Sequence, residues 1–299
     1  MEIIRKRRKY GGFTGNTANT IGCLGLKPTL IGFFGKTSLD PAFVKLMESC
    51  TLVPIGDPAI NQILEFGDGK IMLAHLKELE EFNWTCLTGA LDIGSLKSYF
   101  TDADIVALGY WASMPAFDEV LAEICRHLLI ECNTRMFFDF ADLRIRSREA
   151  LIKTLDLIGE LNQNTPMTLS LNESEAEFLF SRFGATFSSD IDSVEKSLKL
   201  LRRKIGINEI IVHTPYFAAG ANVEESASMP QFHCEKAVIT TGAGDTFNGG
   251  YLTADLGNLN LENRLAIANA ATFFYITNGY APDSGALIKK ASEIKARIK

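Results

Sequence analysis

The chain has 299 residues, of which 46% are hydrophobic and 22% charged, and its formal net charge is −6. This length suits one large α/β domain or two small ones, and a single domain over residues 1–299 is expected. The negative charge argues against nucleic acid as a partner. No apolar run approaches the ~20 residues that a membrane span needs, so no membrane association is expected. Six scattered cysteines without a Cys-x-x-Cys pair predict reduced thiols in the cytoplasm rather than disulfides or a zinc site.

The first part of the chain mixes strands with helices. Small residues at helical spacing after the Gly11-Gly12 turn predict a helix with a smooth face, and two strand-like runs around Gly67-Asp68-Gly69 predict a hairpin. The elements predicted here are strands at 2–10, 29–34, 61–66 and 70–75, and helices at 13–25 and 40–50.

From residue 104 onward the pattern alternates regularly between strand and helix. Such alternation argues for a parallel sheet covered by helices. The predicted strands are 104–109, 135–140, 167–171 and 209–213, with shorter strands near 216–223 and 228–234. The predicted helices are 114–132, 147–161, 173–183, 190–205, 244–256, 261–278 and 285–298.

The most informative stretch is Gly242-Ala243-Gly244-Asp245, where a glycine-rich turn opens a helix. The first turn of a helix has amide groups without intrahelical partners and carries partial positive charge, so it can cradle a phosphate. A carboxylate at the same place suits a base that takes a proton from an attacking hydroxyl. The alternative is that Asp245 only caps the helix, since Asp is a favoured capping residue.

The longer string from Thr240 to Gly250, Thr-Thr-Gly-Ala-Gly-Asp-Thr-Phe-x-x-Gly, resembles the C-terminal signature of the ribokinase-like (PfkB) carbohydrate kinases. The resemblance implies a three-layer α/β/α fold with a mainly parallel central sheet and a small β lid, formed by about 2–10 and parts of 55–77. It also implies that Asp245 is the catalytic base and that Gly242, Ala243 and Gly244 form the anion hole.

Further residues match elements of the same family. The resemblance implies substrate contacts from the Gly11-Gly12 pair and Asn16 at the start of the first long helix, and from Asp139 and Arg144 after a strand. For the last two, a surface loop held by an Asp–Arg pair is the alternative.

A strand followed by Asn172-x-x-Glu175 resembles the family motif that organises Mg²⁺ through water near the nucleotide, although the same spacing is a capping box. The resemblance also implies nucleotide contacts from Asn172, Thr214 and Asn269.

The chain departs from the family pattern in two places. Ile239 stands where relatives carry an Asp that helps to hold a monovalent cation, so we expect little dependence on K⁺. Only ten residues precede Gly11, fewer than in relatives, so we expect the first central strand to be missing; the alternative is that the start of the chain is misplaced.

Together these features predict an ATP- and Mg²⁺-dependent kinase that phosphorylates a hydroxyl of a sugar or polyol. We expect a homodimer through the lid, whose strands are too apolar for a thin exposed sheet. The alternatives are a nucleoside kinase of the same fold and a catalytically silent protein that binds a nucleotide or a sugar.

Overall fold

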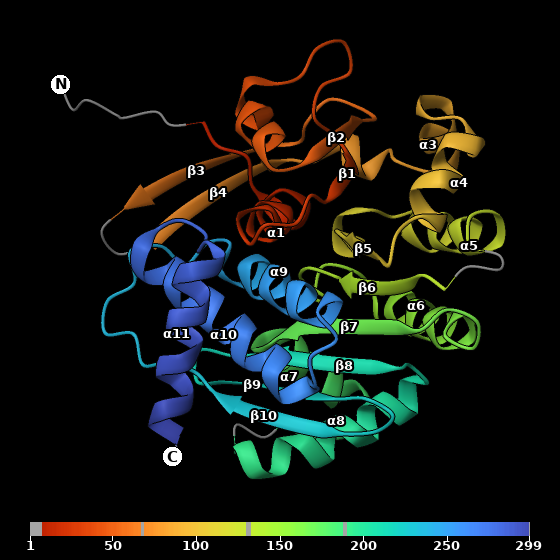
Figure 1. Ribbon diagram of the computed structural model, residues 1–299. Coiled ribbons are helices and arrows are strands. Elements are labelled where there is room, and N and C mark those ends of the chain that lie inside the picture. Colours follow the sequence, from red (N-terminus) through yellow and green to blue (C-terminus); the bar gives the residue numbers. More distant parts are fainter. Residues whose placement is uncertain (1–7, 67–68, 130–132, 188–189, 299) are drawn as a thin grey trace.

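The computed structural model describes residues 8–66, 69–129, 133–187 and 190–298 (Figure 1). The strands are β1 (Thr29–Gly32), β2 (Thr51–Pro54), β3 (Ile60–Phe66), β4 (Gly69–His75), β5 (Ile105–Gly109), β6 (Arg135–Asp139), β7 (Met167–Asn172), β8 (Glu209–His213), β9 (Phe217–Ala221) and β10 (Ser226–Pro230). The α-helices are α1 (Gly12–Cys23), α2 (Lys77–Glu80), α3 (Trp84–Ala90), α4 (Ile93–Thr101), α5 (Phe117–His127), α6 (Arg148–Leu161), α7 (Glu173–Arg182), α8 (Ile191–Ile205), α9 (Ala243–Leu256), α10 (Leu261–Asn278) and α11 (Ser284–Ile298), and two 3-10 helices are η1 (Pro41–Glu48) and η2 (Trp111–Ser113).

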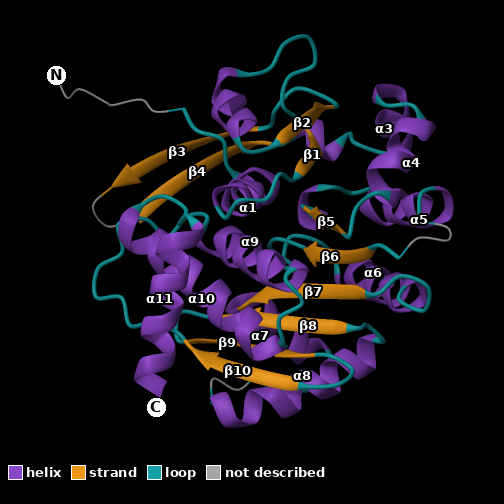
Figure 2. Ribbon diagram, viewed as in Figure 1, coloured by secondary structure: helices purple, strands orange, loops and turns teal. Residues whose placement is uncertain are grey.

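The central sheet has six strands in the order β10-β9-β8-β7-β6-β5. Strands β5 to β8 run parallel, and β9 and β10 extend the sheet in antiparallel fashion. The helices flank the sheet on both sides (Figure 2). The expected three-layer α/β/α fold with a mainly parallel sheet is therefore confirmed.

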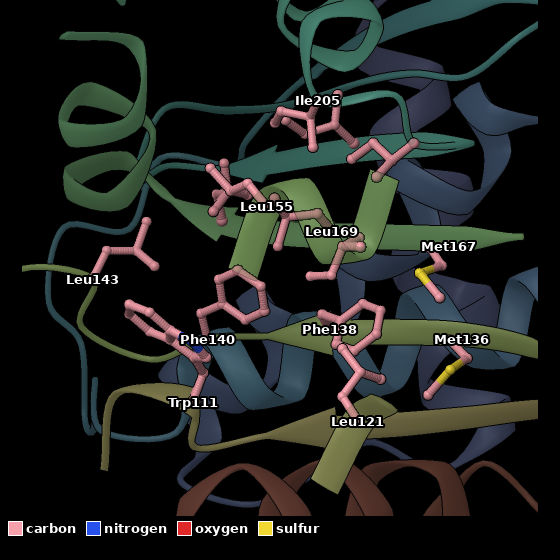
Figure 3. Close-up of a cluster of buried hydrophobic side chains, with 14 of the residues drawn as sticks. Trp111, Leu121, Met136, Phe138, Phe140, Leu143, Leu155, Met167, Leu169 and Ile205 are labelled. Atoms are coloured by element: carbon pink, nitrogen blue, oxygen red, sulfur yellow. The ribbon is translucent and has the colours of Figure 1, made fainter. Parts of the chain in front are cut away.

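The two faces of the sheet bury separate apolar cores, because successive side chains of a strand point to opposite faces. On β6, Phe138 joins the core shared with α5, α6, α7 and α8, whereas Phe137 joins the core shared with α1, α9, α10 and α11. Figure 3 shows part of the first core, where Trp111, Phe140 and Leu155 surround the strands. These cores hold the carboxyl ends of β6, β7 and β8 in place.

A smaller part of the chain stands apart from the central sheet. Strands β1 and β2 pair in parallel as a two-stranded sheet, and β3 and β4 form an antiparallel hairpin that projects from the body (Figure 1). Within the described residues, β1 does not join the central sheet beside β5, because the two strands belong to different sheets. The hairpin predicted around residues 67–69 is confirmed, and its role as a lid stays a prediction.

Several sequence-based expectations need correction. Most of the strand expected at 2–10 lies outside the described residues, and residues 8–10 form no strand, so the hairpin is the described strand-forming part of the expected lid. The helix expected at 40–50 is a 3-10 helix, capped by the Asp40 side chain and begun by Pro41. Strand β2 and helices α2 to α4 were not predicted.

The missed elements are short and carry weak signals. Strand β2 has four residues and ends on a proline, and α3 and α4 each contain a glycine, which lowers helix propensity. Both helices are fixed instead by side-chain caps, Asn83 to the amide of Cys86 and Asp92 to the amide of Ser95. Among the described residues, no helix is both long enough and apolar enough to cross a bilayer.

Candidate active site

The carboxyl ends of three parallel strands bring polar residues to one edge of the sheet. Asp139 ends β6, Asn172 ends β7 and His213 ends β8, and Asn172 and His213 are register partners. The beginnings of α1 and α9 reach the same place, since Asn248 on α9 bonds Asp139 and Asn16 on α1 bonds Asp245 on α9. Ligands of open α/β sheets bind at such an edge.

Helix α9 begins with a turn that leaves amide groups available. Gly242 is the N-cap residue in a left-handed conformation (φ 88°), and no side chain caps the helix. The amide of Ala243 donates to the carbonyl of Thr240 (3.1 Å). The amides of Gly244 and Asp245 have no hydrogen-bond acceptor in the described chain, so they can serve an anionic ligand.

Asp245 is the third residue of α9 and not its cap, because the cap position belongs to Gly242. Its carboxylate accepts a hydrogen bond from Asn16 Nδ2 (2.7 Å), and its carbonyl accepts one from Thr17 Oγ1 (3.1 Å). Burial, together with the negative charge of Asp139, raises the pKa of Asp245 to about 6, while the bond from Asn16 opposes the rise. A carboxylate with this pKa can accept a proton near neutral pH.

The loop before α9 is tied to α10. The Tyr275 hydroxyl donates to the carbonyl of Thr241 (2.8 Å), and the amides of Val238 and Ile239 donate to the carbonyl of Ile276 (2.8 and 3.4 Å). A Cβ atom on Gly242 would lie 2.9 Å from the Tyr275 hydroxyl, so only glycine fits this bend. These contacts with α10 therefore fix the turn that presents the amides of Gly244 and Asp245.

Asp139 is integrated into the sheet edge. Its Oδ2 accepts from Asn248 Nδ2 (2.7 Å) and its Oδ1 from the amide of Ala141 (3.0 Å), and Asn248 Oδ1 in turn accepts from Ser170 Oγ (2.7 Å). Burial raises the pKa of Asp139. Arg144 does not pair with it.

Arg144 forms a bidentate ion pair with Asp142, at 2.7 and 2.8 Å, on the exposed loop after β6. This is the Asp–Arg loop pair weighed from the sequence.

Asn172 and Glu175 form a complete capping box at the start of α7. Asn172 Oδ1 accepts from the amide of Glu175 (3.0 Å), and Glu175 Oε2 accepts from the amide of Asn172 (2.9 Å). Burial, and secondarily the charge of Asp139, raises the pKa of Glu175 to about 8. The capping role is thus observed, and a water-mediated contact of Glu175 with Mg²⁺ stays a prediction.

The Gly11-Gly12 pair opens α1, and Gly12 is left-handed (φ 74°). A Cβ atom on Gly12 would lie 1.8 Å from the hydroxyl of Tyr110, so glycine is required there by a tyrosine that sequence reasoning missed. Tyr110 follows β5 in a left-handed conformation (φ 68°), and burial and the charges of Asp245 and Asp139 raise its pKa. No described residue lies within 4 Å of a Cβ atom on Gly11, so among these residues this glycine has open space beside it.

The two remaining expected nucleotide contacts have their polar atoms engaged inside the fold. Thr214 Oγ1 donates to the carbonyl of Phe217 (2.9 Å) and accepts from two backbone amides, which closes the turn after β8. The fully buried Asn269 donates to the carbonyls of Met229 and Pro230 (3.1 and 3.3 Å). Their contact with a nucleotide remains a prediction, and the side chain at the end of β8 that faces α9 is His213.

The fold and this site define the class of protein, a ribokinase-like kinase. The family model described as prokaryotic ketohexokinase matches residues 1–293. Ketohexokinase from Haloferax volcanii is 24% identical over 284 residues, which cover 94% of this chain and 74% of that protein. The chain belongs to the prokaryotic ketohexokinase family, and it is an ATP-dependent sugar kinase.

Solved structures support the fold. Ribokinase from Thermotoga maritima aligns with a TM-score of 0.67 at 21% identity, covering 94% of this chain and 87% of that one. A putative ribokinase II from E. coli in complex with ATP and Mg²⁺ gives 0.66 at 15% identity, over 95% and 89% of the two chains. The nucleoside kinase of Methanocaldococcus jannaschii gives 0.65 at 19% identity, over 96% and 88%.

Proposed function

We propose that the chain transfers the terminal phosphoryl group of ATP to a hydroxyl of a ketohexose, with Asp245 as the base. The observation that carries the proposal is the position of Asp245 beside the unpartnered amides of the α9 first turn, with a pKa raised to about 6. The relative from Haloferax volcanii is named a ketohexokinase, and the matching family model has the same name, which supports a ketohexose as the acceptor.

The reaction requires one bond to form and one to break. The acceptor hydroxyl attacks the γ-phosphorus of ATP, its proton passes to the Asp245 carboxylate, and ADP leaves as the old P–O bond breaks. The amides of the turn at Gly242–Gly244 stabilise the charge on the transferring group. Because the Ala243 amide already bonds Thr240, the amides of Gly244 and Asp245 carry most of this task.

The acceptor would lie between α1 and the ends of β5 and β6. Gly11, Gly12, Asn16, Asp139 and Arg144 are the proposed contacts, and Gly11 is the one with open space beside it. Asn16 contributes by orienting the base, since its amide group is bonded to Asp245.

Glu175, through water, is the proposed holder of Mg²⁺, with Asn172 beside it. The chemistry of the site fits, since a carboxylate oxygen is a ligand that Mg²⁺ prefers, directly or through water. When bound, Mg²⁺ neutralises charge on the phosphates. Burial raises the pKa of Glu175 to about 8 in the free protein, and a bound cation would favour the ionised carboxylate.

The lid supports the proposal of a homodimer. Strand register places Ile60, Leu64, Ile71 and Leu73 on one face of the β3–β4 hairpin, and these side chains are 45–55% exposed. A two-stranded sheet with such an apolar face is marginal alone, and a second copy of the hairpin would bury it.

Light scattering tests the dimer. The wild type should have twice the mass of the 32.9 kDa chain, and Leu64→Asp with Leu73→Asp should give the monomer. The matched control, Ile63→Asp with Met72→Asp on the opposite face, should leave the dimer intact. A dimer that survives the first pair and dissociates with the second would refute this interface.

Steady-state kinetics with ATP and a panel of ketohexoses, aldoses, polyols and nucleosides tests the activity. The highest kcat/KM should belong to a ketohexose, and Asp245→Asn should abolish turnover while ADP binding survives. A higher kcat/KM for a nucleoside would favour a nucleoside kinase, and no turnover with any acceptor would favour a silent binding protein.

We place the reaction in the cytoplasm, which suits the free thiols at Cys23, Cys50, Cys86, Cys125 and Cys234.

A further inference from the structure

His213, the last residue of β8, lies against the start of α9. A Cβ atom on Gly244 would lie 3.0 Å from Cε1 and 3.4 Å from Nε2 of His213. The imidazole also packs on the ring of Phe247, with centroids 4.8 Å apart and planes at 35°. The ring is therefore held between the end of β8 and the first turn of α9, at the side of the Gly244 amide.

The imidazole is the one side chain of this group without a hydrogen-bond partner in the described chain. Asp245 is bonded by Asn16, Asp139 by Asn248, and Glu175 by the amide of Asn172. Neither ring nitrogen of His213 has such a partner among residues 8–66, 69–129, 133–187 and 190–298. His213 is partly exposed, and its ring nitrogens are not among the fully buried polar atoms that lack a partner in the described chain, so they stay accessible to a ligand at this edge.

The chemistry of that ligand follows from the state of the ring. Burial lowers the pKa of His213 to about 4, so the imidazole is neutral at physiological pH. A neutral imidazole offers one N–H donor and one lone pair. The neighbouring groups of the α9 first turn are amide donors, so a ligand shared by these groups must present acceptor oxygens, as a phosphate does.

We propose that His213 donates a hydrogen bond to a phosphate oxygen of the bound nucleotide and so completes the anion hole from the side of β8. The proposal rests on the proposed kinase function. It differs from the expectation for this strand, which favoured Thr214, because the Thr214 hydroxyl is committed to its own turn. Phe247 holds the imidazole through a tilted ring contact, so little rotamer freedom remains to be lost on binding.

Two variants separate the donor from the ring. His213→Phe keeps an aromatic ring against Phe247 and removes the N–H, whereas His213→Asn keeps a donor. Isothermal titration with ADP and steady-state kinetics should show Kd for ADP and KM for ATP raised by about tenfold or more in His213→Phe, as expected for the loss of one hydrogen bond to a charged group. KM for the sugar should stay unchanged, and His213→Asn should recover part of the nucleotide affinity.

A spectroscopic readout keeps the test independent of folding in the variants. In the wild type labelled with ¹⁵N at histidine, the ring nitrogens of His213 should shift on addition of ADP and not on addition of sugar. Unchanged ADP affinity in His213→Phe, or no ADP-induced shift in the wild type that binds ADP, would overturn the assignment of His213 alone. A wild type that neither binds ADP nor turns over would overturn the kinase function with it.

Discussion

Replacing Asp245 by Asn should make the protein inactive and, at neutral pH, more stable. Folding raises the pKa of Asp245 from 3.8 to about 6, so the folded state holds its proton more tightly than the unfolded chain does. Between these two values the folded state binds more protons, and stability from this group falls as pH rises. Below 3.8 both states are protonated and the group costs nothing.

The magnitude follows from the difference between the two pKa values. One pKa unit corresponds to about 1.4 kcal/mol, so the free energy of unfolding of the wild type should fall relative to Asp245→Asn by about 2 kcal/mol between pH 4 and pH 8. The Asn side chain can still accept the bond from Asn16 Nδ2, so the variant keeps that contact. Turnover should fall by ~10²–10⁴-fold or more, because a general base contributes that much.

Urea denaturation of both proteins at pH 4, 6 and 8 measures this difference directly. The control is Asp142→Asn on the exposed loop. Arg144 lowers the pKa of the Asp142 carboxyl, so replacing this carboxylate should lower the free energy of unfolding at high pH or leave it unchanged. If the difference in free energy of unfolding between Asp245→Asn and the wild type does not grow with pH, burial does not raise the pKa of Asp245. Near-normal kcat in the variant would refute its role as the base.

Three further outcomes are expected. For the wild type, kcat/KM should fall tenfold per pH unit below about pH 6, the pKa of Asp245. Asn16→Ala removes the hydrogen bond that favours the charged carboxylate, so the pH at which kcat/KM begins to fall should rise by about one pH unit. An unchanged pH profile in this variant would show that a group other than Asp245 causes the fall. Glu175→Gln can keep the capping box, so it should raise the Mg²⁺ concentration for half-maximal rate with little change in melting temperature; the opposite result would leave capping as its only role. Activity in K⁺ and Na⁺ at equal ionic strength should agree, since Ile239 offers no side-chain oxygen and Tyr275 holds the Thr241 carbonyl; several-fold activation by K⁺ would contradict this.

Hydrophobic periodicity was sufficient to predict the central sheet and its helices. The strands β5 to β10 and the helices α5 to α11 lie within a few residues of their expected positions, because each is long or strongly patterned. Local pattern was insufficient for the segment 77–101, where short helices depend on side-chain caps. Tertiary packing decides such segments.

The candidate site shows the same division. Asp245 and its turn lie in one continuous motif and could be predicted as a unit. The bond from Asn16 to Asp245 spans 229 residues of sequence, and only the packing of α1 against α9 creates it. Tyr110 could not be predicted because its signal is spatial: it matters through Gly12, the glycine that it touches, and it belongs to no motif. His213 stands beside Thr214 at the end of a predicted strand, but only packing creates its contact with Gly244.

The β1–β2 pair has an apolar cluster of its own, formed by Ala18, Leu30, Phe34, Leu46 and Cys50, apart from the cores that enclose the six-stranded sheet. A region with a separate, small core can open without disrupting the larger ones, as a sub-global unit of lower free energy. Amide protons of β1 and β2 should therefore exchange with solvent through an opening that leaves β6 to β8 protected. Helix α1 supplies both Ala18 of this cluster and Asn16, which orients the base, so such an opening would also weaken the hydrogen bond from Asn16 to Asp245. Binding of an acceptor beside α1 should therefore slow amide exchange in β1 and β2, although the acceptor does not contact these strands.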